Sequence, residues 1–168
     1  MKSSRRDLIK LTGGVAVGMA LPAHAKPADA HGASGRVTLP YEPRAITKLA
    51  KIEINKAVPF TYPDASSPCL LIKMGRGVAG GVGPHEDVVA FSTLCTHQGC
   101  SVAYDTSKRT LKCPCHYTLF DAEKGGAMIC GQATAPLPRI VLNYDAASDM
   151  VTAVAVEGLI YGRQANII

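Results

Sequence analysis

The sequence contains no tryptophan, shows no internal repeat and has few charged residues, which make up 18% of its 168 positions. After residue 25, no segment has the 3.6-residue apolar period of an amphipathic helix, which argues against a helical domain. No apolar run approaches the roughly 20 residues that a membrane-spanning helix needs. A surface with so little charge is typical of a protein that is partly covered by a partner.

The first 25 residues have the pattern of an export signal. Residues 4–10 contain an arginine pair and resemble a twin-arginine signal, and an apolar run covers residues 11–21. Residues 23–25 then read Ala-His-Ala, a small-residue cleavage site. We therefore expect residues 1–25 to be a twin-arginine signal peptide, residues 26–35 to be a flexible leader, and the mature protein to be periplasmic. The alternative for the signal segment is a short amphipathic or buried helix.

Much of the basic charge belongs to this signal. The whole chain has 18 basic and 13 acidic residues, and the part after residue 25 keeps 14 basic against 12 acidic ones. No basic stripe remains, so nucleic acid is not an expected partner. About 143 residues follow the signal, a length that suits one domain with a single core.

Short β-type segments, separated by glycine and proline, recur along the rest of the chain. Residues 51–54 alternate polar and apolar side chains, as a half-buried strand does. The glycines and proline in residues 75–77 and 80–84 are expected to break strands. This pattern predicts an all-β fold for residues 36–168, with an antiparallel β-sandwich or barrel as its base. The expected strands are residues 36–39, 50–54, 69–73, 88–91, 140–142 and 150–156.

Two short motifs of cysteine and histidine carry the chemistry. The first contains Cys95 and His97, and the second contains Cys113 and His116. Residues 105–109 between them read as a polar hairpin turn, and a hairpin would bring the two motifs side by side. Two thiolates and two imidazoles are the ligand set of a Rieske 2Fe-2S centre, in which two histidines replace two cysteines on one iron.

A tetrahedral zinc site is the alternative for these four residues, because zinc also binds cysteine and histidine at short spacing. It leaves two further cysteines, Cys100 and Cys115, without a role. Cys69 and Cys130 follow or precede apolar residues and are expected to be small buried hydrophobes, not ligands. The remaining histidines are expected to be solvated; they are His24, His31 and His85.

The motifs CTHQGC (residues 95–100) and CPCH (residues 113–116) resemble those of the high-potential Rieske proteins. The resemblance implies a disulfide between Cys100 and Cys115. It also implies the Rieske fold, with a small cluster-binding subdomain inserted over about residues 91–138. In such proteins a proline-containing loop covers the cluster from a third side, which assigns that position to Pro136.

High-potential Rieske proteins commonly continue as CHGSxYD, with the serine and tyrosine hydroxyls donating hydrogen bonds to sulfur. In this chain Thr118 keeps a hydroxyl at the serine position, whereas Phe120 lacks the hydroxyl of the tyrosine. Donors to the sulfurs stabilise the reduced cluster and raise the reduction potential. The resemblance therefore implies a positive potential that lies below the top of the Rieske range.

Residues 94–144 resemble the Rieske small subunit of arsenite oxidase. The resemblance implies a periplasmic heterodimer with a large molybdopterin subunit that also holds a 3Fe-4S cluster and oxidises arsenite. Electrons would then pass through the Rieske 2Fe-2S cluster of this chain to a cytochrome c or a cupredoxin. No residue of this chain is expected to bind arsenite.

Three other classes of protein remain open at this point. One is a membrane-anchored Rieske subunit of a quinol-oxidising cytochrome bc complex, which would keep its N-terminal segment. Another is a cytosolic Rieske ferredoxin that serves an oxygenase, and the third is a binding module stabilised by zinc.

Overall fold

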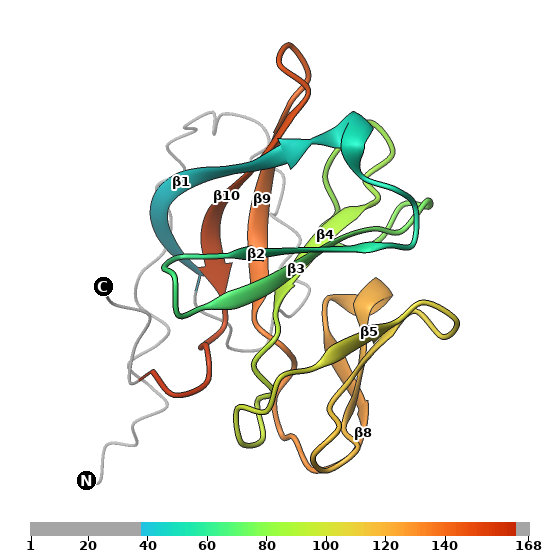
Figure 1. The fold of residues 1–168 in the computed structure, drawn as a ribbon, viewed down its shortest axis with the longest axis vertical. Coiled ribbons are helices and arrows are strands. Elements are labelled where there is room, and N and C mark those ends of the chain that lie inside the picture. The colour runs from blue at the N-terminus through green and yellow to red at the C-terminus, as the bar shows by residue number, and fades with distance from the viewer. Residues whose placement is uncertain (1–37, 164–168) are drawn as a thin grey trace, which may run out of the picture. The chain divides into compact units, whose positions relative to one another are not determined.

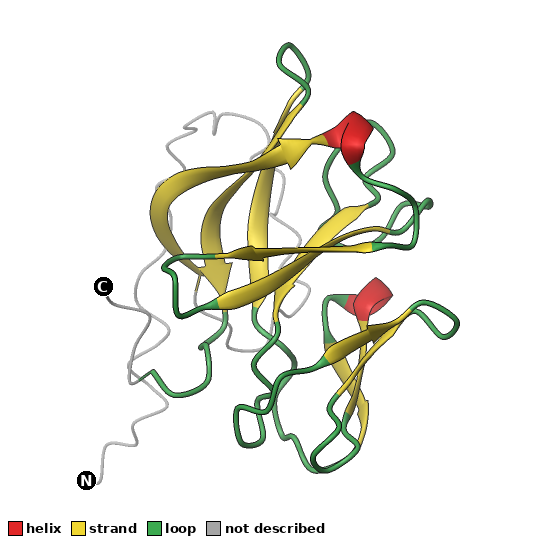
Figure 2. Cartoon of the chain, in the orientation of Figure 1, coloured by secondary structure: helices red, strands yellow, loops and turns green. Residues whose placement is uncertain are grey.

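The computed structural model describes residues 38–163, and the expected signal and leader, residues 1–25 and 26–35, lie outside this range. The described residues form two antiparallel sheets (Figures 1 and 2), which confirms the expected all-β fold. No helix among them has the length and apolar character of a membrane span. The elements are β1 (Thr38–Lys48), the 3-10 helix η2 (Leu49–Lys51), β2 (Ala57–Thr61), β3 (Pro68–Lys73), β4 (Val88–Ser92), β5 (Ala103–Asp105), β6 (Thr110–Lys112), β7 (Leu119–Asp121), the 3-10 helix η3 (Ala122–Lys124), β8 (Ala127–Cys130), β9 (Arg139–Asp145) and β10 (Met150–Glu157).

The larger sheet has six strands in the order β1-β10-β9-β4-β3-β2. It curls so that its two edge strands approach each other (Figure 1). Arg44 on β1 donates a hydrogen bond of 2.8 Å to the carbonyl of Thr61 on β2. The rings of Tyr41 and Tyr62 also meet edge to face, with centroids 6.0 Å apart. The sheet is therefore the barrel-like base that the sequence predicts.

Strands β3 and β4 contribute to two separate cores, because successive side chains of a strand point to opposite faces. Leu71 and Ala90 pack inside the curled sheet. Ile72 and Phe91 point the other way and pack against the side chains of the smaller sheet and its loops. This second core includes two of the candidate ligands, so the packing of the base also holds the site.

The smaller sheet has four strands in the order β5-β6-β7-β8 and lies in the sequence between β4 and β9. The polar turn expected at residues 105–109 joins β5 to β6, and its Asp105 carboxylate accepts the backbone N–H of Ser107 at 2.9 Å. The ion pair of Arg76 with Glu123 links the loop after β3 to η3. The boundaries of a cluster-binding subdomain at about residues 91–138 stay a prediction.

The prediction of a strand over residues 50–54 is wrong. The chain there forms η2, and the backbone N–H of Ala50 donates to the Asp149 carboxylate at 3.0 Å instead of to a neighbouring strand. Ile52 is buried as the alternation suggested, but Ile54 is 60% exposed and makes only an isolated bridge to Lys73. The turn between β9 and β10, far away in the sequence, determines this local structure.

Candidate iron–sulfur centre

The two motifs lie on adjacent loops at the ends of the β5–β6 hairpin. We name residues 95–100, between β4 and β5, ligand loop 1, and residues 113–118, between β6 and β7, ligand loop 2. The Cys95 and Cys113 thiols are buried and interact directly. The Nδ1 atoms of His97 and His116 lie 3.2 Å apart on the outer side, and the His116 side chain is exposed. The structure thus arranges the four predicted ligands as one buried sulfur pair and one outer imidazole pair.

This arrangement fits a two-iron cluster better than a zinc ion. Ligand atoms of one zinc ion lie within about 4.6 Å of one another, because each is at most about 2.3 Å from the metal. Within residues 38–163, the one group of three or more potential ligand atoms that lie even within 4.8 Å of one another is Cys100, Cys113 and Cys115, two of which are bonded to each other. The four predicted ligands form two pairs instead, which suits one pair on each iron.

The sulfur pair is buried, and burial disfavours the negatively charged thiolate form of a cysteine unless a metal ion is bound. Burial raises the pKa of the Cys95 thiol, and the neighbouring Cys113 thiol raises it further. The backbone N–H groups of His97 and Gln98 act in the opposite direction, since they donate to the Cys95 sulfur and favour its thiolate. A metal removes the thiol proton outright. These two N–H donors then favour the more negative, reduced state of a bound cluster.

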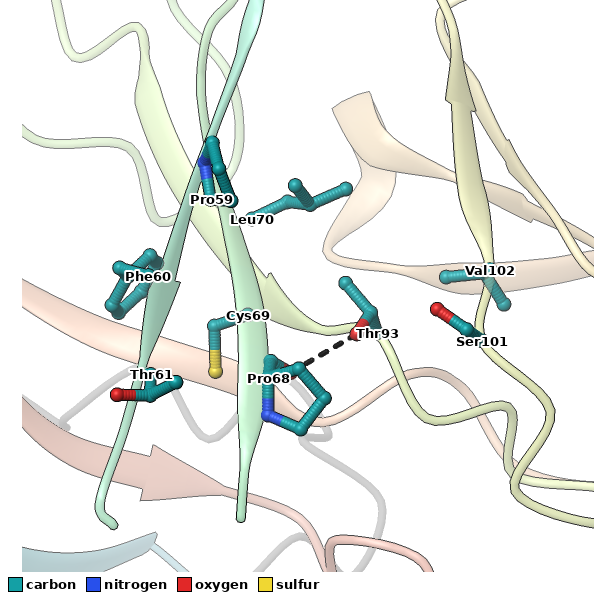
Figure 3. Close-up of a pocket in the computed structure, with 9 residues that line it drawn as sticks. All are labelled: Pro59, Phe60, Thr61, Pro68, Cys69, Leu70, Thr93, Ser101 and Val102. Atoms are coloured by element: carbon teal, nitrogen blue, oxygen red, sulfur yellow. Dashed lines mark hydrogen bonds between the residues drawn. The ribbon is translucent and has the colours of Figure 1, made fainter. Parts of the chain in front are cut away.

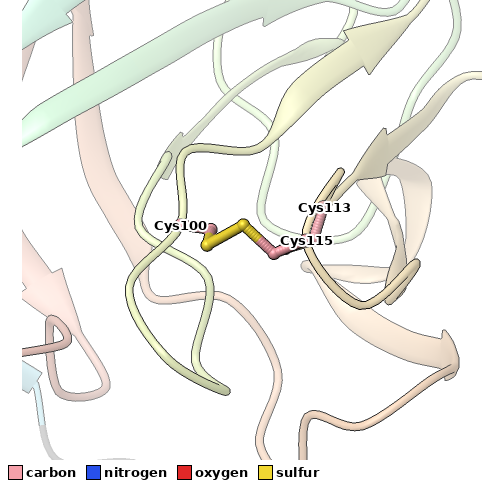
Figure 4. Close-up of side chains that lie close together, drawn as sticks. All are labelled: Cys100, Cys113 and Cys115. Carbon is pink, nitrogen blue, oxygen red and sulfur yellow. A yellow bond between two sulfur atoms is a disulfide. The ribbon is translucent and has the colours of Figure 1, made fainter.

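The disulfide that the resemblance implied is present between Cys100 and Cys115 (Figure 4). It joins ligand loop 1 to ligand loop 2, with the two Cα atoms 6.5 Å apart. The Sγ atoms of Cys100, Cys113 and Cys115 lie within 4.8 Å of one another, so the bridge is packed directly against a candidate ligand. Neither loop can move away from the other without breaking this bond.

Thr118 also forms hydrogen bonds that the sequence did not indicate. Its hydroxyl oxygen accepts the backbone N–H groups of Gln132 and Ala133 at 3.0 and 3.3 Å, and its carbonyl accepts the N–H of Cys113 at 2.8 Å. The fully buried side chain therefore anchors the loop after β8 to ligand loop 2. A hydroxyl also has one proton to donate, and its donation to a cluster sulfur stays a prediction.

The third loop, residues 131–138, is hydrogen-bonded to ligand loop 1. The Thr96 hydroxyl of ligand loop 1 donates a short hydrogen bond of 2.6 Å to the Ala135 carbonyl. Pro136, the next residue, is half-buried and has a fixed φ that stiffens the loop. Its expected role beside the cluster stays a prediction, but the loop that contains it is bonded to both ligand loops.

Phe120 is fully buried in the second core together with Cys95 and Cys113. A Phe120→Tyr substitution is expected to place a hydroxyl near a cluster sulfur and raise the reduction potential. One added hydrogen bond contributes roughly 1 kcal/mol, which corresponds to about 40 mV for a one-electron couple. A redox titration followed by the EPR signal of the reduced cluster measures the shift. Phe60→Tyr, on edge strand β2, is the control, and an unchanged potential in Phe120→Tyr would contradict the prediction.

The two remaining cysteines differ, and the expectation for one of them is wrong. Cys69 is buried in the core of the curled sheet, as expected, and burial raises its pKa to about 12. Cys130 is exposed, although a buried position was expected. It ends β8, the edge strand of the smaller sheet, where its apolar neighbours Met128 and Ile129 are also exposed. His85 is exposed, as expected, whereas His24 and His31 lie outside the described residues.

Alkylation of the folded, cluster-loaded protein at about pH 8 is expected to modify Cys130 and not Cys69. The thiolate is the reactive form of cysteine. Cys69 is buried, and its pKa of about 12 keeps its thiol protonated at about pH 8. Mass spectrometry of proteolytic peptides identifies the modified residue. Unfolding before alkylation serves as the positive control for Cys69, and its modification in the folded protein would contradict the assigned burial.

A shallow hollow of about 420 Å³ lies beside ligand loop 1 (Figure 3). In it, Thr93 donates from its hydroxyl to the Pro68 carbonyl at 3.2 Å, which fixes the chain just before Cys95 to strand β3. None of the lining residues carries an acidic or basic side chain. The lining residues are Pro59, Phe60, Thr61, Pro68, Cys69, Leu70, Thr93, Ser101 and Val102.

Comparison with known proteins supports the assignment of this site as an iron–sulfur centre. Residues 67–141 match the model of the Rieske [2Fe-2S] domain. The chain is 38% identical to the iodate reductase subunit IdrB of Denitromonas iodatirespirans, over 97% of this chain and 86% of that protein. It is 35% identical to the iodate reductase subunit IdrB of Pseudomonas sp. (strain SCT), over 73% of this chain and 64% of that one.

A solved structure shows the same fold. The soluble domain of Rieske protein II (soxF) from Sulfolobus acidocaldarius superposes with a TM-score of 0.67. The match has 21% sequence identity and covers 76% of this chain and 84% of that one. The chain has two cysteines and two histidines in pairs and a disulfide that joins the two ligand loops. Together with these relatives, the features show that the chain belongs to the Rieske proteins and that its cofactor is a Rieske-type 2Fe-2S cluster, which transfers electrons.

Proposed function

We propose that this chain is the electron-transfer subunit of a periplasmic arsenite oxidase. The observation that carries the electron-transfer role is the pairing of the ligands, with the sulfur pair buried and the imidazole pair on the outer side. The exposed His116 gives a partner access to one end of the centre. The resemblance of residues 94–144 to the small subunit of arsenite oxidase supports arsenite as the substrate of the complex.

The chemistry of arsenite requires a second centre in another subunit. Oxidation of arsenous acid with water to arsenic acid releases two electrons and two protons, whereas a 2Fe-2S cluster exchanges one electron at a time. The two electrons must therefore be collected elsewhere and passed on singly. A large molybdopterin subunit with a 3Fe-4S cluster is the proposed partner, because molybdenum changes its oxidation state by two. A cytochrome c or a cupredoxin is the proposed acceptor.

The similarity to iodate reductase subunits favours a second candidate function. Both candidates exchange electrons with an inorganic oxyanion through a partner subunit, but the electrons flow in opposite directions. In an iodate reductase this chain would deliver electrons to the partner, and in an arsenite oxidase it would remove them. The arrangement of ligands is the same for both directions, so the substrate must be determined by experiment.

The complex that co-purifies with this chain from the periplasm provides the test. The proposal expects a large molybdenum subunit, and it expects arsenite to produce the EPR signal of the reduced Rieske centre in the oxidised complex. Iodate that reoxidises a pre-reduced complex, without any reduction by arsenite, would establish the second candidate instead.

Two further measurements separate the proposal from a cytochrome bc subunit. The proposal expects the mature protein in the soluble periplasmic fraction, with its N-terminus near Lys26. A chain that retained Met1 in a membrane fraction, and a cluster that was reduced by quinol, would overturn both the proposed location and the proposed complex.

A further inference from the structure

Ligand loop 1 is a tight loop that is closed on itself. The Cys95 N–H donates to the Cys100 carbonyl at 2.9 Å, and the Gly99 N–H donates to the Cys95 carbonyl at 2.8 Å. Gly99 has a φ of +73°, which favours glycine. The disulfide holds this loop at Cys100, and the hydrogen bond of Thr96 holds it on the side of the third loop. These two attachments are made by Cys100 and Thr96, and Gly99 itself takes part in neither.

Gly99 is instead covered by an aromatic ring from the other end of the chain. A Cβ atom added to Gly99 would lie 2.4 Å from Cδ1 and 2.6 Å from Cε1 of Tyr161. The ring therefore rests directly on the glycine backbone, two residues after the ligand His97. Tyr161 stays 42% exposed, so one side of the ring contacts ligand loop 1 while part of it faces solvent.

The segment that carries Tyr161 is fixed to the base on both sides of the ring. Ile160 is fully buried in the core of the curled sheet. Arg163 forms an ion pair with Asp64 and donates a hydrogen bond of 2.7 Å to the Ser67 hydroxyl. Because its neighbours are anchored in this way, Tyr161 cannot follow ligand loop 1 if that loop moves outwards.

We propose that Tyr161 is a positioning residue for the cluster, a brace that fixes the Gly99 side of ligand loop 1 and thereby the orientation of His97. Disulfide, Thr96 and Tyr161 then hold three different points of the loop. The contact is made by the ring carbons, so the phenol hydroxyl is not required. The proposal concerns the cluster itself and holds for either direction of electron flow.

The first test compares three variants of the full-length, cluster-loaded chain. Tyr161→Ala is expected to release iron to a chelator about tenfold faster, because local opening of ligand loop 1 becomes easier. It is also expected to change the EPR g-values of the reduced cluster, since His97 is no longer held in one orientation. Tyr161→Phe should behave as the unchanged protein, and Leu159→Ala is the matched control, a half-exposed apolar residue of the same segment.

The second test uses glycine substitutions and stays informative if Tyr161→Ala is unstable. Gly99→Ala combines the strain of a positive φ with a clash against Tyr161, whereas Gly125→Ala has a similar φ of +62° and meets no atom within 4 Å. Gly99→Ala is therefore expected to accelerate iron loss clearly more than Gly125→Ala. With Tyr161→Ala already present, the added effect of Gly99→Ala should fall to that of Gly125→Ala.

Either of two results would overturn the proposal. One is a Tyr161→Ala variant with unchanged g-values and an unchanged rate of iron release. The other is an effect of Gly99→Ala that is the same with and without the Tyr161 ring, because the ring would then not be the contact that matters.

Discussion

A His116→Ala variant of the assembled complex is expected to lose the Rieske EPR signal and to turn over more than about 100-fold more slowly with its electron acceptor. Residues that merely support a metal ligand change affinity or activity by about 10- to 100-fold, and His116 is itself one of the imidazole pair. In the proposed arsenite oxidase, this loss would lie downstream of the substrate chemistry. Under that proposal, reduction of the partner's molybdenum centre by arsenite in a single turnover should survive, and stopped-flow spectroscopy separates the two steps.

His85→Ala is the matched control for this experiment. His85 is also an exposed histidine, but it lies in the loop between β3 and β4 and contributes no predicted ligand. Its replacement should leave both the EPR signal and turnover unchanged. If the His116→Ala complex lacked the cluster, remained intact and still turned over normally, electrons would have to leave by a route that bypasses this subunit.

That the four candidate ligands come together could be predicted from the sequence, because the information for it is local. Cys95 and His97 are two residues apart, Cys113 and His116 are three apart, and the polar turn between them defines a hairpin. Strands β3, β4 and β10 could be predicted for a related reason. Each is a continuous or alternating apolar segment that is bounded by turn residues.

The features that could not be predicted depend on residues that are distant in the sequence. Residues 50–54 alternate like a strand, but hydrogen bonds to Asp149 hold the start of this segment in a 3-10 helix. Cys130 follows apolar residues, but its exposure is decided by the position of β8 at the edge of a sheet. Strand β2 contains Pro59, a residue that argues against a central strand but that an edge strand such as β2 tolerates.

The same limit applies within the site. The resemblance predicts that Thr118 places a hydroxyl near the cluster, but not that this hydroxyl accepts two N–H groups from the third loop. The sequence gives no sign that Tyr161 covers Gly99, because the two residues are 62 positions apart and most of the strands lie between them. The motifs therefore predict the ligands, whereas the contacts that hold these residues in place come from the fold.

The double variant Cys100→Ser/Cys115→Ser is expected to lower the free energy of unfolding by about 2 to 3 kcal/mol. A disulfide stabilises a protein mainly by restricting the unfolded chain, and the two cysteines here are 15 residues apart. The variant should also lose its cluster faster, because the bridge lies within 4.8 Å of the Cys113 sulfur and joins the two ligand loops. Urea unfolding measures the first effect, and iron release to a chelator measures the second.

Cys130→Ser provides the control, since it removes an exposed free thiol and leaves the bridge intact. It should reproduce the unfolding curve, the rate of iron release and the reduction potential of the unchanged protein. The two measurements on the double variant also separate two roles of the disulfide. A loss of unfolding free energy with unchanged iron release would assign the bridge to the stability of the chain alone. If the double variant kept full cluster occupancy, stability and potential, the bridge would have no role in holding the ligand loops together, and Thr96, Thr118 and the Tyr161 ring would have to account for their rigidity.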